Sequence, residues 1–381
     1  MDDIALPGLP APPPLGASAL PAGTYDGSLV LVTGGGTGLG RAIAAEFARL
    51  GADLLIVSRR ERHLAPARAE LAKLGTRVRS AVCDIRDPKR VSEVFDEGGL
   101  PDVLVNNAAA NFPVATEDMS PNAWQAVVDI TLTGTFLMTR EFGRRHLAAG
   151  TPGSVIDVGA SYAWTGGPGF AHSAAAKAGV ESLVRTLAVE WGPYGIQVNG
   201  LVPGLMPHED MTEDIRGNLA RSTGGTGGAA GTNPEHHRPG QGTRRTGAGR
   251  DEKDDRDDRH PGNAPGGEDT RDGRDGQDAG DGRAGDGRAG DGRAGDGRAG
   301  DGRAGDGRAG DADALGRRQP ALRVGVPREL GWAATFLASP YARFITGHTL
   351  VVDGANWQRR DMVAPPVTPV RDQLGRGPFT G

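Results

Sequence analysis

Regular alternation of apolar runs with helical segments is the feature that most constrains how this chain can fold. Short apolar runs suited to buried strands occur at 29–33, 53–57, 78–82, 103–105, 155–158, 195–202 and 348–352. Between most of them, apolar residues recur with helical spacing over about 10 to 20 residues. Strands that alternate with helices of this length form parallel sheets whose two faces are covered by helices. The sequence therefore predicts an α/β fold with a doubly wound parallel sheet.

One long segment interrupts this alternation. From 220 to 314 the chain contains no Val, Ile, Leu, Met, Phe, Tyr, Trp or Cys, so the segment cannot form a core and is expected to be disordered. Within it, 281–310 consists of six tandem copies of DGRAG. The range 217–320 holds 18 basic and 20 acidic residues, a near-neutral balance that a nucleic-acid-binding tail would not have. We interpret the insertion as a passive solvated loop, with recruitment of a partner as the alternative.

These composition changes define the expected domains. Residues 25–216 and 321–358 together give about 230 residues, the size of a single α/β domain. The insertion at 217–320 is expected to be a disordered, low-complexity segment within that domain. Residues 1–24 are rich in Pro, Ala and Gly and should form a disordered arm, and 359–381 a flexible tail.

Charge and composition narrow the possible partners. A formal net charge of −5 argues against a nucleic-acid partner, and no apolar run approaches the roughly 20 residues of a membrane span. The single cysteine, Cys83, excludes an intramolecular disulfide and fits a reducing compartment. The first 23 residues carry two acids and no Lys or Arg, unlike a secretory or mitochondrial leader. We therefore expect a cytoplasmic protein. His172 lacks a second ligand nearby in the sequence, so no metal site is expected.

A glycine-rich turn links the first strand to the first helix. The run from Thr33 to Gly40 reads TGGGTGLG. Glycines permit a tight turn and let backbone N–H groups approach a pyrophosphate, whose charge suits a helix N-terminus. In this strand, turn and helix context the motif predicts a Rossmann-like dinucleotide site. The cofactor-binding residues expected in the turn are Gly34, Thr37, Gly38, Leu39 and Gly40.

The end of the second strand bears on which dinucleotide binds. Ser58, Arg59 and Arg60 occupy the place where a site for NAD carries an acid that binds the ribose 2′-hydroxyl. An arginine there accommodates a 2′-phosphate, so Arg59 favours NADPH. The alternative is that Arg59 and Arg60 are only the solvated start of a helix.

The stretch from 154 to 204 carries the residues with the most chemistry. Ser173 and Lys177 are four residues apart in an expected helix and therefore lie on one face. Tyr162 lies eleven residues before Ser173, in the loop after a buried strand. A phenol, a hydroxyl and an ammonium at the end of a parallel strand indicate a proton-donating site. They could equally be ordinary polar residues at a loop and helix end.

At this point the chain resembles the short-chain dehydrogenase/reductase superfamily. The resemblance rests on TGGGTGLG, on Cys83-Asp84, on Asn106-Asn107-Ala108, on the helix with Lys177, and on Asn199 with Pro203-Gly204. Two positions depart from the superfamily pattern. Ser173 stands four residues before the lysine, where the usual catalytic tyrosine lies, and Thr131 replaces the usual asparagine of the central helix.

A subgroup of that superfamily, the NADPH-dependent 2,4-dienoyl-CoA reductases, shares the displaced tyrosine. The chain is similar to it at NNAAANF (106–112), at SPNAW (120–124), at CDIRDP (83–88), and in having a tyrosine eleven residues ahead of the serine in SAAAK. The resemblance implies catalytic roles for Tyr162, Asn111, Ser173 and Lys177. It implies cofactor contacts at Asp84, Asn107, Lys177, Pro203, Gly204, Leu205 and Met206. It implies acyl-CoA contacts at Arg86, Phe112 and Ser120.

Some of these residues have simpler interpretations. Asn111 could cap or turn the loop before Pro113, and Phe112 could belong to the core. Cys83 is interpreted as a small buried hydrophobic residue beside the adenine pocket rather than a reactive thiol.

The resemblance implies NADPH-dependent reduction of 2,4-dienoyl-CoA to 3-enoyl-CoA in the β-oxidation of unsaturated fatty acids. Reduction of another acyl-CoA or carbonyl substrate, such as a 3-oxoacyl or 2-enoyl thioester, is the first alternative. A non-catalytic NADP-binding scaffold is the second. A homo-oligomer, a tetramer by resemblance, is also expected, with an acyl-CoA as the small-molecule partner.

Overall fold

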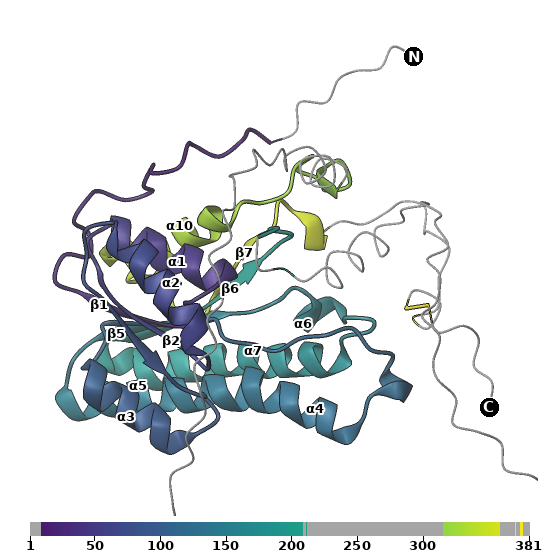
Figure 1. The fold of residues 1–381 in the computed structure, drawn as a ribbon, viewed down its shortest axis with the longest axis horizontal. Coiled ribbons are helices and arrows are strands. Elements are labelled where there is room, and N and C mark those ends of the chain that lie inside the picture. The colour runs from purple at the N-terminus through teal and green to yellow at the C-terminus, as the bar shows by residue number, and fades with distance from the viewer. Residues whose placement is uncertain (1–8, 209–210, 212–314, 359–369, 371–373, 376–381) are drawn as a thin grey trace, which may run out of the picture. The chain divides into compact units, whose positions relative to one another are not determined.

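Seven parallel strands form one sheet in the computed structural model, which describes residues 9–208, 211, 315–358, 370 and 374–375. All of these residues belong to one compact unit. The strands are β1 (Leu29–Thr33), β2 (Asp53–Ser58), β3 (Val78–Val82), β4 (Val103–Asn106), β5 (Gly153–Val158), β6 (Ile196–Pro203) and β7 (Thr349–Val352). Their order across the sheet is β3-β2-β1-β4-β5-β6-β7. The doubly wound parallel sheet predicted from the sequence is therefore confirmed, as Figure 1 shows.

Helices cover both faces of the sheet (Figure 1). They are α1 (Gly38–Arg49), α2 (Glu61–Ala72), α3 (Pro88–Gly98), α4 (Pro121–Val128), α5 (Gly134–Ala149), α6 (Tyr162–Thr165), α7 (Ala171–Trp191) and α10 (Pro327–Ala338). A π-helical turn, η2 (Asp129–Thr133), joins α4 to α5. Short 3₁₀ turns are η1 (Thr116–Asp118), η3 (Gly192–Tyr194), η4 (Pro340–Ala342) and η5 (Asn356–Gln358).

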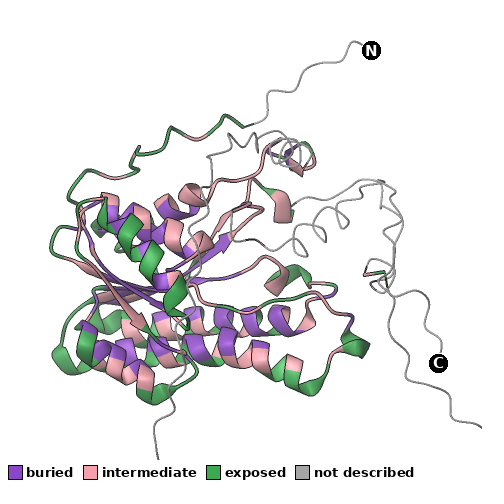
Figure 2. Cartoon of the chain, in the orientation of Figure 1, coloured by how far each residue is buried: buried purple, intermediate pink, exposed green. Residues whose placement is uncertain are grey.

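Each face of the sheet has its own hydrophobic core. On one face, α1, α2 and α10 contribute side chains such as Phe47, Leu64 and Leu330. On the other, α3, α5 and α7 contribute side chains such as Phe95 and Phe142. Figure 2 shows the buried residues concentrated in the sheet and on the helix faces turned toward it. Strands covered on both sides read as continuous apolar runs, which is why the sequence located them.

The N-terminal arm differs from the sequence expectation. Of the predicted disordered arm at 1–24, residues 9–24 are described, and they are held against α10 and the segment before it. Arg328 donates to the carbonyl of Pro13 at 2.7 Å, and Trp332 donates to that of Ala17 at 3.1 Å. Leu20 packs against the core. The donors are side chains of α10, whereas the arm contributes only backbone carbonyls, which every residue has. The arm's own sequence therefore carries no sign of these contacts, and its composition alone suggested a loose segment.

The remaining domain predictions fall largely outside the described residues. The predicted insertion at 217–320 lies outside them as far as residue 314, including every DGRAG copy. The described chain resumes at Leu315, ahead of the expected boundary at 321, and Gln319 and Ala321 are buried. Most of the predicted tail at 359–381 also lies outside the described residues. In the part of the chain that is described, no helix is long and apolar enough to cross a membrane.

Candidate active site

The glycine-rich turn takes the conformation that its sequence predicts. β1 ends at Thr33, α1 begins at Gly38, and Gly34 and Gly38 have φ angles of 66° and 50°, which side chains other than glycine rarely adopt. A Cβ atom at Gly40 would collide with the carbonyl oxygen of Gly34 and the amide nitrogen of Asn107. Thr37 makes no side-chain hydrogen bond that would cap α1. The first turn of α1 is therefore closely packed, and a helix N-terminus of this kind suits an anion.

The end of β4 is tied to this turn. The Thr33 hydroxyl accepts from the backbone N–H groups of Asn107 and Ala108, each at 3.0 Å, and Asn107 Nδ2 donates to the Thr33 carbonyl at 3.1 Å. β1 and β4 are neighbours at the point where the strand order reverses. Open α/β sheets bind ligands in the crevice at this point.

A cavity of about 310 Å³ lies at the same place. Its lining is Gly34, Thr37, Gly38, Leu39, Val57, Ser58, Arg59, Cys83, Ile85, Asn107, Ala108, Ala109, Ile130 and His208. The residues predicted to bind the cofactor thus supply six of the lining positions. The sequence analysis missed Ile130 and His208 because each reaches the cavity from a distant segment that carries no nucleotide motif. The tight turn, the start of α1 and the adjacent arginine fit a dinucleotide.

The two arginines after β2 take different positions. Arg59 lines the cavity, whereas Arg60 is the exposed residue directly before α2. Both arginines are exposed at the start of the helix, and only Arg59 also adjoins the cavity. Cys83 lines the cavity as a buried residue, and burial raises the pKa of its thiol to about 12. The thiol is therefore neutral near pH 7 and acts as a small apolar wall.

Two residues with different predicted roles bind each other. Arg86 donates two hydrogen bonds to the Asp84 carboxylate, at 2.6 and 2.9 Å. These bonds lower the pKa of Asp84. The predicted cofactor contact at Asp84 and the predicted acyl-CoA contact at Arg86 thus form one ion pair at the end of β3.

Tyr162, Ser173 and Asn111 come together as the sequence analysis expected. Tyr162 begins the short helix α6, and its hydroxyl lies 3.0 Å from Ser173 Oγ in α7. Asn111 Nδ2 donates to the same hydroxyl at 3.4 Å. Burial raises the pKa of Tyr162, against a smaller opposing effect of the Ser173 hydrogen bond. The phenol is therefore protonated near neutral pH and can donate a proton or a hydrogen bond.

Lys177 lies one helical turn beyond Ser173. Its side chain is 6% exposed, and Nζ donates to the carbonyl of Val158 at the end of β5. Burial lowers the pKa of the ammonium group to about 8, although the charge of Asp157 opposes that change. Lys177 therefore supplies a buried positive charge, and its pKa lies close to neutral pH.

Thr131, the departure from the superfamily asparagine, has a defined role in the structure. It lies in the π-helical turn η2, fully buried. Its hydroxyl accepts from the backbone N–H of Ala110 at 3.2 Å and lies 3.4 Å from the Ala110 carbonyl oxygen. Thr131 thus holds the loop that carries Asn111 at the next position. Single π-helical turns are frequent at functional sites, but their sequence signal is weak.

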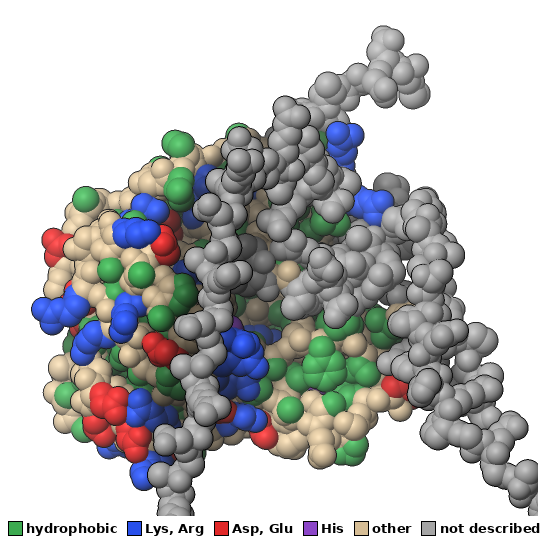
Figure 3. All heavy atoms as spheres, viewed as in Figure 1, with side chains coloured by type: hydrophobic (Ala, Val, Ile, Leu, Met, Phe, Trp, Pro, Cys, Tyr) green, Lys and Arg blue, Asp and Glu red, His purple; other side chains and the backbone are tan. Residues whose placement is uncertain are grey.

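The other predicted acyl-CoA contacts lie near Asn111. Phe112 is 37% exposed, and its ring packs edge-on against the buried ring of His172, 4.6 Å away between centroids. Ser120 caps α4 by accepting from the backbone N–H of Ala123 at 3.2 Å. Hydrophobic side chains gather on the face over α4, α6 and α7 (Figure 3). Trp124 in α4 and Trp164 in α6 are also exposed, at 40% and 39%. This face is suited to an apolar chain.

The residues predicted after β6 to contact the cofactor do not line the glycine-turn cavity. Gly204, Leu205 and Met206 line a separate cavity of about 190 Å³ together with residues of β7 and the segment before α10. Pro203 is the last residue of β6, and the N–H of Gly204 donates to the Val352 carbonyl at 2.9 Å. Within the described chain, His208 is the residue after β6 that reaches the glycine turn.

Family models match most of the described chain. A model described as short chain dehydrogenase matches residues 28–220, and one described as enoyl-(acyl carrier protein) reductase matches residues 300–355. A solved structure from Beutenbergia cavernae, described as a putative NAD(P)-dependent gluconate 5-dehydrogenase with NADP bound at low occupancy, is 25% identical to this chain with a TM-score of 0.59. The similarity covers 88% of this chain and 99% of that one.

Several curated relatives carry the name of one kind of reductase, and another is named as a reductase of a different carboxyl-CoA. A probable 2,4-dienoyl-CoA reductase of Caenorhabditis elegans, named as producing (3E)-enoyl-CoA, is 44% identical over 191 residues, which are 49% of this chain and 62% of that protein. A probable 2,4-dienoyl-CoA reductase of Bacillus subtilis, named as producing (2E)-enoyl-CoA, is 40% identical over 180 residues, or 46% of this chain and 71% of that protein. The chain spans just under two thirds of the length of the C. elegans relative.

Proposed function

The chain belongs to the short-chain dehydrogenase family, and on that premise we propose that it reduces 2,4-dienoyl-CoA to 3-enoyl-CoA with NADPH in unsaturated fatty acid β-oxidation. The observation that carries this proposal is the position of the Tyr162 hydroxyl between Asn111 and Ser173. Tyr162 is displaced from the usual superfamily position, and 2,4-dienoyl-CoA reductases share this displacement. The names of two relatives support the same substrate class.

The residues of the glycine-turn cavity fit the proposed cofactor. The turn and the start of α1 would hold the pyrophosphate, and Arg59 would bind the 2′-phosphate that distinguishes NADPH from NADH. Lys177 would hold the nicotinamide ribose hydroxyls and add positive potential beside Tyr162. When bound, NADPH supplies the hydride.

The chain's own residues would act on the thioester oxygen. Hydride addition at C5 of the dienoyl group moves electron density through the conjugated system onto that oxygen. Asn111 Nδ2 and the Tyr162 hydroxyl would donate hydrogen bonds to it, each worth roughly 3 to 4 kcal/mol at the transition state. Ser173, 3.0 Å from the phenol, would orient it. Protonation at C2 then leaves the double bond between C3 and C4.

Replacing Tyr162 with Phe tests the proposal. Because the ring packing is kept and one donor is lost, kcat with a 2,4-dienoyl-CoA should fall by about 10²- to 10³-fold. NADPH affinity, measured by fluorescence, should stay unchanged. Tyr194, exposed in η3, provides the control, and Tyr194→Phe should keep wild-type kinetics. Full activity in Tyr162→Phe would refute the assignment.

Substrate and product analysis separates the proposal from its alternatives. Activity with a 3-oxoacyl-CoA or 2-enoyl-CoA alone would leave the family intact and replace the substrate. NADPH binding without turnover of any acyl-CoA would indicate a scaffold. Protonation at C4 instead of C2 would give the 2-enoyl product, as in the name of the B. subtilis relative, and NMR of the product distinguishes the two.

We also propose a cytoplasmic location and a homo-oligomeric assembly, a tetramer by resemblance, with no nucleic-acid or membrane partner. Light scattering of the purified chain tests the assembly.

A further inference from the structure

A buried acidic residue lies directly behind the candidate site and has no role in the proposed mechanism. Asp157 is in β5, 1% exposed, and Asp157 and Asn106 of β4 are register partners in the parallel sheet. Asn106 Nδ2 donates to Asp157 Oδ1 at 2.8 Å and to Thr139 at the same distance. The carboxyl group is thus fixed in the core by one strong hydrogen bond.

Two oxygen atoms of this pair remain without partners. Asp157 Oδ2 and Asn106 Oδ1 are both buried, and neither has a hydrogen-bond partner among the described residues. A buried unsatisfied oxygen is costly, more so when it carries charge. A proton on Asp157 would let the carboxyl group donate to the Asn106 oxygen. An ionised Asp157 needs a counter-charge instead.

Lys177 is the cation available to provide that counter-charge. Its ammonium group donates to the carbonyl of Val158, the residue that follows Asp157 in β5, and it is nearly as buried. The charged groups of the described chain that act on Asp157 are Lys177 and Glu181, both from α7. Glu181 already has a partner, since Arg185 donates to it at 2.9 Å.

We propose that Asp157 is a positioning residue that keeps the Lys177 ammonium group protonated at the pH where the enzyme works. Lys177 touches the proposed cofactor and Asp157 acts only through it, so the inference rests on the proposed function for its catalytic meaning. The electrostatic pairing itself does not depend on the substrate.

The titration order of the two groups supports this role. Burial raises the pKa of Asp157 to about 7, and burial lowers that of Lys177 to about 8. As pH rises, Asp157 therefore ionises first, and its negative charge then opposes loss of the Lys177 proton. Below pH 7 the carboxyl group is protonated and can bond to Asn106, while Lys177 needs no support to keep its proton.

Lysine NMR tests the pairing without substrate or cofactor. The chain has only four lysines, Lys73, Lys89, Lys177 and Lys253, so selective ¹³Cε labelling of the full-length protein gives a spectrum simple enough to assign with a Lys177→Arg variant. In the wild type, the Lys177 signal should titrate below the usual range of a lysine side chain. In Asp157→Asn its midpoint should fall further, by about one pH unit or more. Glu181→Gln, which removes the buried carboxylate of α7 that acts on Asp157, should leave the Lys177 midpoint within a few tenths of a pH unit.

Several outcomes would overturn the proposal. An unchanged Lys177 midpoint in folded Asp157→Asn would do so, as would a wild-type Lys177 signal that shows no second inflection where the Asp157 carboxyl group ionises. The second measurement holds even if the variant does not fold. In activity assays, the alkaline limb of the kcat/KM profile should move to lower pH in Asp157→Asn. A shifted lysine titration without any dienoyl-CoA reduction would refute the proposed substrate and leave the pairing intact.

Discussion

At the scale of single residues, the structure gives different positions to neighbouring side chains that the sequence could not tell apart. Arg59 and Arg60 are adjacent, yet Arg59 lines the glycine-turn cavity and Arg60 precedes α2. In the same way, the superfamily motif marked Thr131 only as a missing asparagine. Its bonds to Ala110 depend on the π-helical turn, which apolar periodicity does not reveal. The candidate cluster could be expected because Ser173 and Lys177 are four residues apart in a helix and Tyr162 lies in the loop before it.

Arg59 should determine cofactor preference. In Arg59→Ala, loss of a charged contact to the 2′-phosphate should raise KM for NADPH about 10- to 100-fold, because hydrogen bonds to charged groups contribute about 1.5 to 3 kcal/mol. KM for NADH should hardly change. Arg60→Ala is the adjacent control and should behave like the wild type in initial-rate assays. An equal loss with both cofactors would show that Arg59 does not bind the 2′-phosphate.

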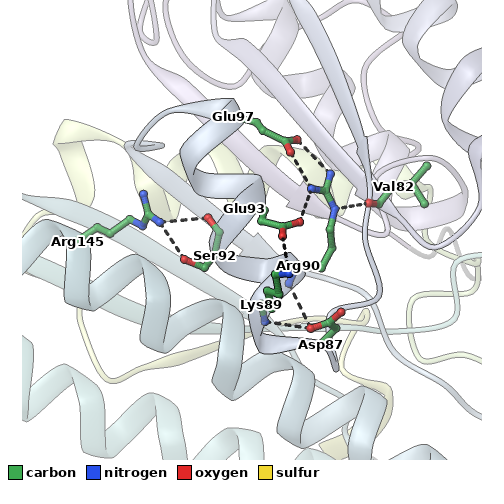
Figure 4. A network of polar contacts seen from close by, with 8 residues as sticks. All are labelled: Val82, Asp87, Lys89, Arg90, Ser92, Glu93, Glu97 and Arg145. Carbon is green, nitrogen blue, oxygen red and sulfur yellow. Dashed lines mark hydrogen bonds and ion pairs between the residues drawn. The ribbon is translucent and has the colours of Figure 1, made fainter. Parts of the chain in front are cut away.

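At the scale of elements, a network of ion pairs joins α3 to α5. Arg145 of α5 donates to the carbonyl and the hydroxyl of Ser92 in α3, at 3.1 and 3.2 Å (Figure 4). Glu141, 6% exposed, accepts from Arg144 at 2.6 Å and from Arg145 at 2.7 Å. Within α3, Arg90 bonds Glu93 and Glu97, also shown in Figure 4. Helical spacing places the partners within each helix on one face, but the bond between helices requires the packed structure.

Glu141 should make stability depend on acid pH. The Arg144 hydrogen bond is the main cause that lowers the pKa of Glu141, to about 2. A lowered pKa means that the stabilisation is complete above the unfolded value near 4.5 and is lost as pH falls toward 2. Glu141→Gln should cost about 1 to 3 kcal/mol at pH 7 and flatten the decline below pH 4.5, measured by urea unfolding. Glu97→Gln removes an exposed ion pair with Arg90 and should cost much less, because solvent screens that pair. A pH dependence unchanged in Glu141→Gln would contradict this role.

At the scale of the whole molecule, the sheet and its helices could be predicted because strands covered on both faces leave apolar runs in the sequence. The docking of the N-terminal arm could not be predicted, because the arm accepts most of these bonds through backbone carbonyls, which are the same in every sequence. Leu9 donates to the Ala321 carbonyl at 2.9 Å, and Arg323 donates to that of Pro10 at 3.0 Å. With the Arg328 and Trp332 bonds, the arm holds the part of the chain that resumes after residue 314.

This contact extends toward the candidate site. Gly325, two residues after Arg323, donates from its N–H to the Leu205 carbonyl at 2.9 Å, and a Cβ on Gly325 would touch Met206. The arm therefore supports the segment before α10, and that segment supports the residues expected to contact the nicotinamide.

Deleting residues 1–18 should destabilise the protein, whereas deleting residues 1–8 should not. The longer deletion removes four hydrogen bonds to the segment 321–332, each worth about 0.5 to 1.5 kcal/mol, and part of this is offset by the entropy of an arm that no longer needs ordering. A net loss of about 1 to 2 kcal/mol corresponds to a Tm lowered by about 2 to 8 °C for a domain of this size. Calorimetry of both truncations measures the difference, and KM for NADPH should rise only in the longer one. Equal Tm values for the two truncations would show that the arm contributes nothing to the fold, because the shorter deletion keeps every one of these four bonds.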